Sequence, residues 1–182
     1  MKKSVIILAL TFAAGAVFAQ KKRTTTSARI SFDATTSLDK LPKAENKTAI
    51  AALDTKKGTV SFEAIIKNFS FENPKMQEHF NSAGWMNSDK YPTATFKGTI
   101  TNMSEVNFKK DGSYSAKIEG DLTMHGVTKK VTTTAPIVVK GKTINATADL
   151  SVHEEDYGIN GASIGAGKVS KEPKISVSAE FK

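Results

Sequence analysis

Residues 121–140 read DLTMHGVTKKVTTTAPIVVK and predict two long β-strands joined by a tight turn. In the second strand, Val131 and Ile137 belong to an apolar set that alternates with polar residues, as in a strand with one buried face. Gly126 can adopt the positive φ that such a turn requires. The residue before it is a histidine, where asparagine is common. His125 therefore either fixes the turn or contacts a ligand.

A period of two continues along most of the chain after residue 29 and predicts further half-buried strands. Regular strands are expected at 91–100, 113–124, 131–139, 144–152 and 175–181, and less regular ones at 28–34, 48–53 and 58–71. Lys140-Gly141-Lys142 and Asp111-Gly112 have the composition of hairpin turns. About eight antiparallel strands with short links indicate an all-β sandwich or a closed barrel.

One short helix interrupts the strands. Asn73 is a good N-cap and Pro74 suits the first helical position. The helix should end by Gly84 and close one end of whatever the strands build. Nearby apolar side chains are expected to be core or lid: Met76, Phe80, Trp85 and Met86.

The first nineteen residues, Met1–Ala19, predict a cleaved secretory signal. Lys2 and Lys3 precede an apolar run over residues 5–18, which ends in the small-residue pattern of a cleavage site. A membrane anchor is the alternative, but a span needs about 20 apolar residues. The folded domain is then expected at 20–182, in the periplasm or secreted. Because the chain has no cysteine, that domain must rely on packing rather than on disulfides.

The formal charge of +8 is spread along the chain. Its one cluster, Lys21-Lys22-Arg23, is expected in a disordered tail. With one Trp and three Tyr, few rings are available to stack on bases, so we expect no nucleic-acid partner. The apolar positions are rich in Ala and Gly and lack the aromatic girdles of outer-membrane barrels, so we expect no stable membrane insertion.

The inward positions include many small residues, which raises the question of whether the interior is filled or hollow. An eight-stranded barrel has a size at which side chains just fill it or leave room for one small ligand. The alternation alone leaves both alternatives open, and a hollow interior would select apolar ligands. The small inward residues are Ala94, Gly98, Ala116, Gly120, Ala135, Ala146, Ala148 and Ala179.

Catalytic and metal-binding patterns are not found in the sequence. The histidines His79, His125 and His153 lack metal-ligand spacing. The acidic stretch 153–156, HEED, indicates a solvated loop more than a cation site. There is no G-x-S-x-G elbow, cysteine nucleophile or Gly-rich phosphate loop. We therefore expect no enzyme, no catalytic residue and no metal.

Three stretches resemble the YceI-like family of exported lipocalin-like proteins. Residues 88–98, SDKYPTATFKG, resemble its "KYP-x-x-x-F" strand, and residues 120–129, GDLTMHGVTK, are similar to its most recognisable segment. Asp156-Tyr157-Gly158 and the closing strand from Lys174 resemble its "D-(F/Y)-G" element and last strand. The chain departs from the family at Lys130, where proline is usual. It also departs at Glu154 and Glu155, where a basic residue is frequent.

The resemblance implies an elongated, helix-capped antiparallel barrel with a hydrophobic interior. It associates such proteins with long isoprenoid, quinone-tail or fatty-amide ligands in the periplasm, and it favours a hollow interior. We therefore predict an exported carrier with an about eight-stranded lipocalin-like barrel. The alternative is a ligand-free structural or stress-related module with a filled barrel.

No cofactor is expected beyond a bound isoprenoid-like lipid, and the sequence is compatible with a homodimer. Most of the predicted ligand-binding residues would provide apolar enclosure, with Tyr114 and His125 as polar contacts. The predicted set is Phe62, Phe96, Ile100, Tyr114, Ile118, Leu122, His125, Val131, Ile137, Leu150 and Phe181.

Overall fold

Antiparallel strands make up most of residues 22–182, the part of the chain that the computed structural model describes. The strands are β1 (Lys22–Asp33), β2 (Lys43–Asp54), β3 (Thr59–Ile65), β4 (Ser70–Phe71), β5 (Thr93–Ile100), β6 (Gly112–Met124), β7 (Val127–Lys140), β8 (Thr143–Ser151) and β9 (Lys174–Phe181). The helices are α1 (Pro74–Asn81) and α2 (Ala162–Gly165), with 3-10 turns η1 (Ile66–Asn68), η2 (Met103–Glu105) and η3 (Glu154–Tyr157).

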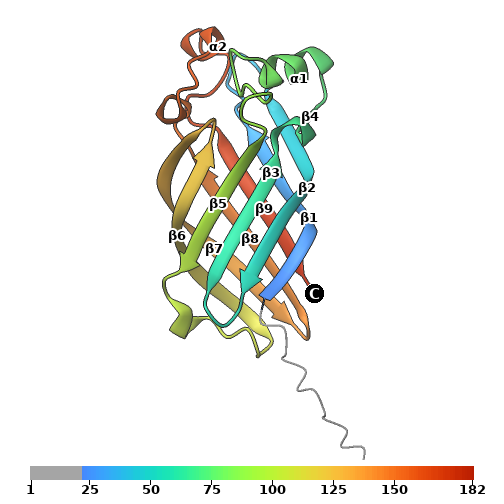
Figure 1. Ribbon diagram of the computed structural model, residues 1–182, viewed down its shortest axis with the longest axis vertical. Helices are drawn as coiled ribbons and strands as arrows, with labels where there is room; N and C mark the ends of the chain where they lie inside the picture. The colour runs from blue at the N-terminus through green and yellow to red at the C-terminus, as the bar shows by residue number, and fades with distance from the viewer. Residues whose placement is uncertain (1–21) are drawn as a thin grey trace, which may run out of the picture.

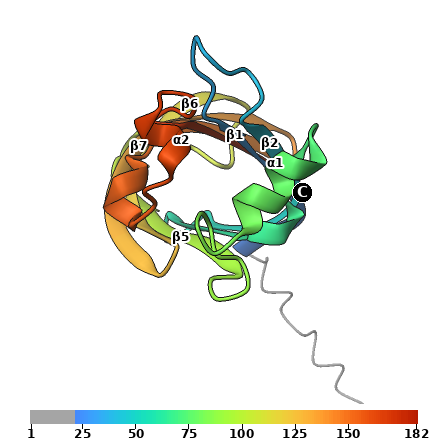
Figure 2. The same ribbon diagram turned by 90° about the horizontal axis from the view of Figure 1, so that it is seen from above.

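Pairing between β1 and β2 closes the sheet into a barrel. Around the ring the order is β1-β9-β8-β7-β6-β5-β3-β2, and every pair is antiparallel. The short β4 pairs with the start of β2 and stands outside this ring of eight. Figures 1 and 2 show the tilted strands and the ring that they form. The predicted all-β, eight-stranded, lipocalin-like barrel is thus confirmed.

The irregular phase of the first strands comes from interruptions in the β1–β2 ladder. The register shifts between Thr25 and Ala28 and again between Ala28 and Ile30. In β2, buried positions change from even to odd numbers between Asn46 and Ala49. A β-bulge inserts one residue and bends its strand, so each strand keeps an apolar inner face despite the shift.

These first strands are longer than predicted, and the expected disordered tail is wrong for its last two residues. Lys22 and Arg23 belong to β1, where they pair with Asp54 and Leu53. A strand partner on β2 is available to these basic residues, and this long-range pairing is not visible in the local sequence. Lys21 lies outside the described residues.

Asn46 satisfies the backbone where β3 leaves β2. Its side chain is fully buried, and its Nδ2 donates to the carbonyl of Ile65 (3.0 Å). Its Oδ1 accepts from the backbone N–H of Thr48 (2.9 Å). After this point η1 intervenes, and β4 continues along β2 by pairing with Ala44 and Glu45.

Helix α1 has the predicted start and covers one end of the barrel. The Asn73 side chain accepts a hydrogen bond from the backbone N–H of Lys75 (2.9 Å), which caps the helix. Near the C-terminal end of the helix, Phe80 is buried against three aromatic rings, whose centroids lie 5.0–5.8 Å from the centroid of its own ring. These rings belong to Phe32, Phe69 and Phe71.

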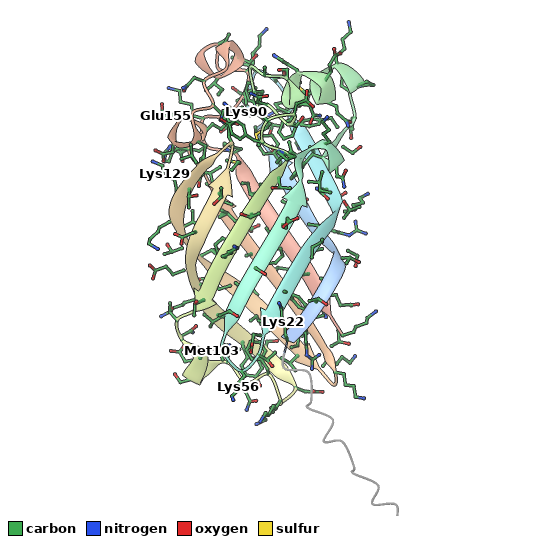
Figure 3. The ribbon with its side chains drawn as sticks, viewed as in Figure 1. Lys22, Lys56, Lys90, Met103, Lys129 and Glu155 are labelled. Carbon is green, nitrogen blue, oxygen red and sulfur yellow. The ribbon has the colours of Figure 1, made fainter. Side chains whose placement is uncertain are left out.

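The two ends of the barrel differ. The helical end carries α1, α2 and η3, and Lys90, Lys129 and Glu155 lie there (Figure 3). We call the opposite end the turn end. It carries η2, and Lys22, Lys56 and Met103 lie there (Figure 3).

The two predicted glycine turns both lie near the turn end, but only one is a hairpin. Gly141 lies in the two-residue connection between β7 and β8, as predicted. Asp111 does not form the second hairpin turn. Instead, it precedes β6 after a long connection, and its carboxylate accepts from the backbone N–H of Gly141 (2.8 Å).

His125 and Gly126 form the two-residue turn between β6 and β7. Their φ values are +52° and +77°, and two successive positive values characterise a type I′ hairpin turn. His125 Nδ1 lies 2.8 Å from the carbonyl of Tyr157; since a carbonyl only accepts, Nδ1–H is the donor. The imidazole also meets the ring of Tyr91 edge-on, at 4.7 Å between centroids. The histidine thus fixes the turn and ties it to η3.

Replacing His125 separates these two structural roles. Asparagine tolerates positive φ, so His125→Asn should keep the turn and lose only the contacts to Tyr157 and Tyr91. We expect a loss of about 1 kcal/mol in the free energy of unfolding, measured by chemical denaturation. His125→Val should cost clearly more, because a β-branched residue is strained at positive φ. An unchanged stability in His125→Asn would contradict the proposed link to η3, and equal losses in the two variants would contradict the positive-φ requirement at this turn.

Candidate functional site

A cavity of about 160 Å³ lies inside the barrel, with almost wholly apolar walls. All eight strands of the ring contribute inward side chains to it. The lining extends from Leu53, Ile100 and Phe181 toward the turn end to Trp85 and Ile159 at the helical end. Ligand pockets usually measure about 300–1,000 Å³, so this cavity is slender for the length that it covers.

Nine of the eleven residues predicted from the sequence as ligand-binding line this cavity. The barrel brings them together from six strands, because each occupies an inward position of its strand. They are Phe62, Phe96, Ile100, Ile118, Leu122, Val131, Ile137, Leu150 and Phe181.

The two predicted polar contacts, Tyr114 and His125, lie outside the cavity lining. The Tyr114 hydroxyl donates to the backbone carbonyl of Lys110 (2.8 Å), in the connection that follows η2. The imidazole of His125 is held between Tyr91 and Tyr157 at the β6–β7 turn. Alternation identifies inward positions along a strand, but it gives no information about how far along the barrel the hollow space extends.

Two small residues that suggested a hollow interior instead make room for an aromatic ring. Gly98 and Gly120 face each other across β5 and β6. A Cβ atom built on either glycine would lie 2.5–2.6 Å from the outer edge of the Phe96 ring. Phe96 therefore lies over both glycines, and any larger residue at Gly98 or Gly120 would displace it.

The turn end of the interior is filled by the protein itself. Val106, Val139 and Ile144 are buried there and do not line the cavity. Met103 of η2 packs onto Gly58 of the β2–β3 turn, so closely that a Cβ at Gly58 would lie 2.6 Å from its sulfur. The barrel is thus filled at one end and hollow beyond it.

Side chains from irregular segments cover the hollow part at the helical end. Phe80, Trp85 and Met86, three of the four residues expected as core or lid, line the cavity from α1 and the segment after it, and Ile159 lines it from the loop after η3. The fourth, Met76, is partly buried and does not line the cavity. The Trp85 ring rests on Gly161, where a Cβ would lie 2.2 Å from it. The segments before β5 and after η3 therefore meet directly across this end. Strand periodicity gives no signal for such residues.

Glu154 also lines this cavity, which contradicts the prediction of a solvated acidic loop for its side chain. It is 3% exposed, and its Oε2 has no hydrogen-bond partner among residues 22–182. Burial raises the pKa of the Glu154 carboxyl to about 8, because a charged carboxylate is costly to remove from water. At neutral pH the group is therefore mostly a neutral carboxylic acid.

The buried carboxyl should make stability depend on pH. Its pKa is higher in the folded chain (about 8) than its ordinary value of 4.5, so the folded state holds the proton more tightly between these values. This contribution is complete below pH 4.5, and the free energy of unfolding should fall by up to ~1.4 kcal/mol per pH unit toward pH 8. Glu154→Gln should remove this slope in denaturant titrations. Glu155→Gln, at an exposed neighbour, should keep it; equal slopes in Glu154→Gln and the unmodified protein would contradict the assignment.

No helix within 22–182 is long and apolar enough to cross a membrane. Within that range, no group of three or more His, Cys, Asp and Glu side chains is placed to hold a metal ion.

Solved structures share this barrel. A polyisoprenoid binding domain from Saccharophagus degradans superposes with a TM-score of 0.73 at 10% identity, over 89% of this chain and 98% of that one. Burkholderia cenocepacia BcnA gives a TM-score of 0.71 at 17% identity, over 85% and 96% of the two chains. At such low identity these likenesses concern the fold.

The sequence comparisons define the family. A UPF0312 protein from Pseudomonas putida is 35% identical over 111 residues, which cover 57% of this chain and 51% of that protein. The chain thus spans about half the length of the curated relatives that it matches. The family profile described as the YceI-like domain matches residues 11–181. With this match and the shared barrel, the resemblance seen in the sequence is confirmed: the chain belongs to the YceI-like domain family.

Proposed function

We propose that this protein binds and carries a long apolar molecule, such as an isoprenoid, a quinone tail or a fatty amide, inside its barrel. The observation that carries the proposal is the almost wholly apolar cavity enclosed by all eight strands of the ring. A binding role without catalysis fits walls that, over the described part of the chain, carry one ionisable group, Glu154, and otherwise only uncharged side chains.

The energetics of apolar burial support a tight but weakly selective complex. Burying roughly 400 Å² of apolar ligand surface contributes on the order of 10 kcal/mol before the cost of association is subtracted. A cavity of about 160 Å³ favours one slender chain that enters lengthwise. Longer chains would require the cover residues Trp85 and Met86 to move aside.

The named relatives support the same class of ligand. The Saccharophagus degradans structure with this fold is described as a polyisoprenoid binding domain. Our proposal extends that chemistry to this chain on the basis of its own cavity.

We also propose that the barrel acts in the periplasm or outside the cell, after cleavage behind Ala19. The support is the basic start, apolar run and small-residue site over Met1–Ala19, which lie outside the described residues. When the full chain is expressed in a Gram-negative host, osmotic shock should release a protein whose intact mass matches a chain that starts at Gln20. A full-length protein retained in the cytoplasm would contradict export and leave the cavity proposal untouched.

Filling the cavity should abolish binding without unfolding the barrel. Ala148 lines the cavity and is only partly buried, so Ala148→Phe should place its ring in the hollow space. A cavity of about 150 Å³ accommodates benzene, so the added ring should occupy much of the available volume. We expect at least a tenfold loss of affinity for linear prenols in a fluorescent fatty-probe displacement assay.

The matched control lies three residues away on the same strand. Asn145 is exposed and absent from the lining, so Asn145→Phe should bind like the unmodified protein. Native mass spectrometry followed by organic extraction should show an apolar molecule on the purified protein and should also report any homodimer. A protein without a bound lipid that ignores added prenols and quinones would instead support a ligand-free structural module.

A further inference from the structure

The cavity has one ionisable feature that apolar enclosure leaves unexplained. Among residues 22–182, Glu154 is the single ionisable residue in its lining. Its Oε2 is buried and has no hydrogen-bond partner among the described residues. An unpaired buried polar atom is costly, and few occur in native proteins. The group therefore calls for a partner that the described part of the chain does not provide.

The backbone around Glu154 fixes where the side chain points. Its N–H donates to the carbonyl of Lys171 (3.2 Å), and its own carbonyl accepts from the N–H of Ile159 (3.1 Å). The bond from His125 to the carbonyl of Tyr157 fixes the far end of η3. With both ends of η3 held, Glu154 stays directed into the cavity while Glu155 is exposed at the helical end (Figure 3).

The other ionisable side chains of η3 and its flanks that carry ion-pair contacts lie at the surface, as does Glu155. Asp156 pairs with Lys129 of β7 (3.4 Å), and His153 pairs with Glu172 before β9 (3.5 Å). All four side chains are about half exposed. Burial alone raises the pKa of the Glu154 carboxyl. The lining therefore contains no cation that would keep Glu154 charged or attract an anionic end group.

We propose that Glu154 is a polar subsite, where its carboxyl donates a hydrogen bond to the carbonyl end of an otherwise apolar chain. This inference rests on the proposed apolar-ligand function and adds the chemistry of the end group. A ketone, quinone or amide oxygen accepts such a bond without bringing charge into the apolar cavity. A phosphate or carboxylate end would bring an anion there with no partner, at a high desolvation cost. The subsite also orients the chain, with its polar end toward η3 and its tail toward the turn end.

The test compares chains that differ only at one end. Dodecane, methyl decyl ketone and dodecylamine are titrated by displacement of a fluorescent probe from pH 6 to about 9.5. The unmodified protein should bind the ketone about fivefold more tightly than dodecane at low pH, the range expected for one neutral hydrogen bond. This advantage should disappear above about pH 8, where the carboxylate can no longer donate.

Three variants identify the group responsible. Glu154→Leu should abolish the preference for the ketone and leave dodecane affinity within about twofold. Glu154→Gln keeps an N–H donor and should retain the preference at every pH. Glu155→Leu, at the exposed neighbour, should behave like the unmodified protein. Infrared spectra should show the carbonyl band of the protonated Glu154 shift when the ketone binds, and thermal melts confirm that each variant is folded.

Several results would overturn the inference. A ketone preference that survives in Glu154→Leu would place the polar contact elsewhere. Dodecylamine binding that exceeds ketone binding and strengthens through pH 8 would make Glu154 an ion-pairing site for amines. Dodecane binding without any ketone preference would refute the subsite alone, whereas failure of all three chains to bind would refute the apolar-ligand function itself.

Discussion

Closure of the sheet by the β1–β2 pairing is the constraint on which the rest of this structure depends. It leaves the ring of eight strands without a free edge, which removes the exposed backbone that long Thr-rich and Val-rich strands would otherwise offer to other chains. It also places the apolar side of every strand in one common interior, so the volume of those side chains decides how much space remains. The bulges in β1 and β2 belong to the same constraint, because they bend the strands and restore the inward phase.

The interior is divided between structure and cavity in a way that its composition does not reveal. At the turn end, Val106, Val139 and Ile144 fill the space and provide packing that a disulfide-free domain needs. In the middle, Phe96 uses the room above Gly98 and Gly120. Toward the helical end, small residues such as Ala94 and Ala148 leave the walls far enough apart for a cavity. Stability and binding thus draw on different parts of one barrel, so a cavity-filling change can alter binding with little effect on folding.

The helical end supplies what the strands lack. Helix α1 is anchored by Phe80 among three aromatic rings, and Trp85 rests against Gly161 across the barrel. Apolar walls attract any apolar chain with little direction, because burial energy depends on area and not on orientation. A single neutral carboxyl at one end of the cavity would supply that direction. The tie between His125 and η3 therefore has functional meaning under our proposal, since it holds in place the segment that carries Glu154.

Local sequence patterns were enough to predict the strand alternation, the helix start at Asn73-Pro74, the His125-Gly126 turn and nine cavity-lining positions, because these follow from local periodicity and backbone preference. They could not determine that Lys22 and Arg23 pair with β2, since strand pairing is a long-range contact. They also could not show that Gly98 and Gly120 accommodate Phe96, or that Tyr114 lies beyond the hollow part. Glu154 is the sharpest case: an acidic run such as HEED indicates a solvated loop. Only the tertiary structure, by anchoring η3 to β7 and to the segment before β9, turned one of its carboxyls away from water.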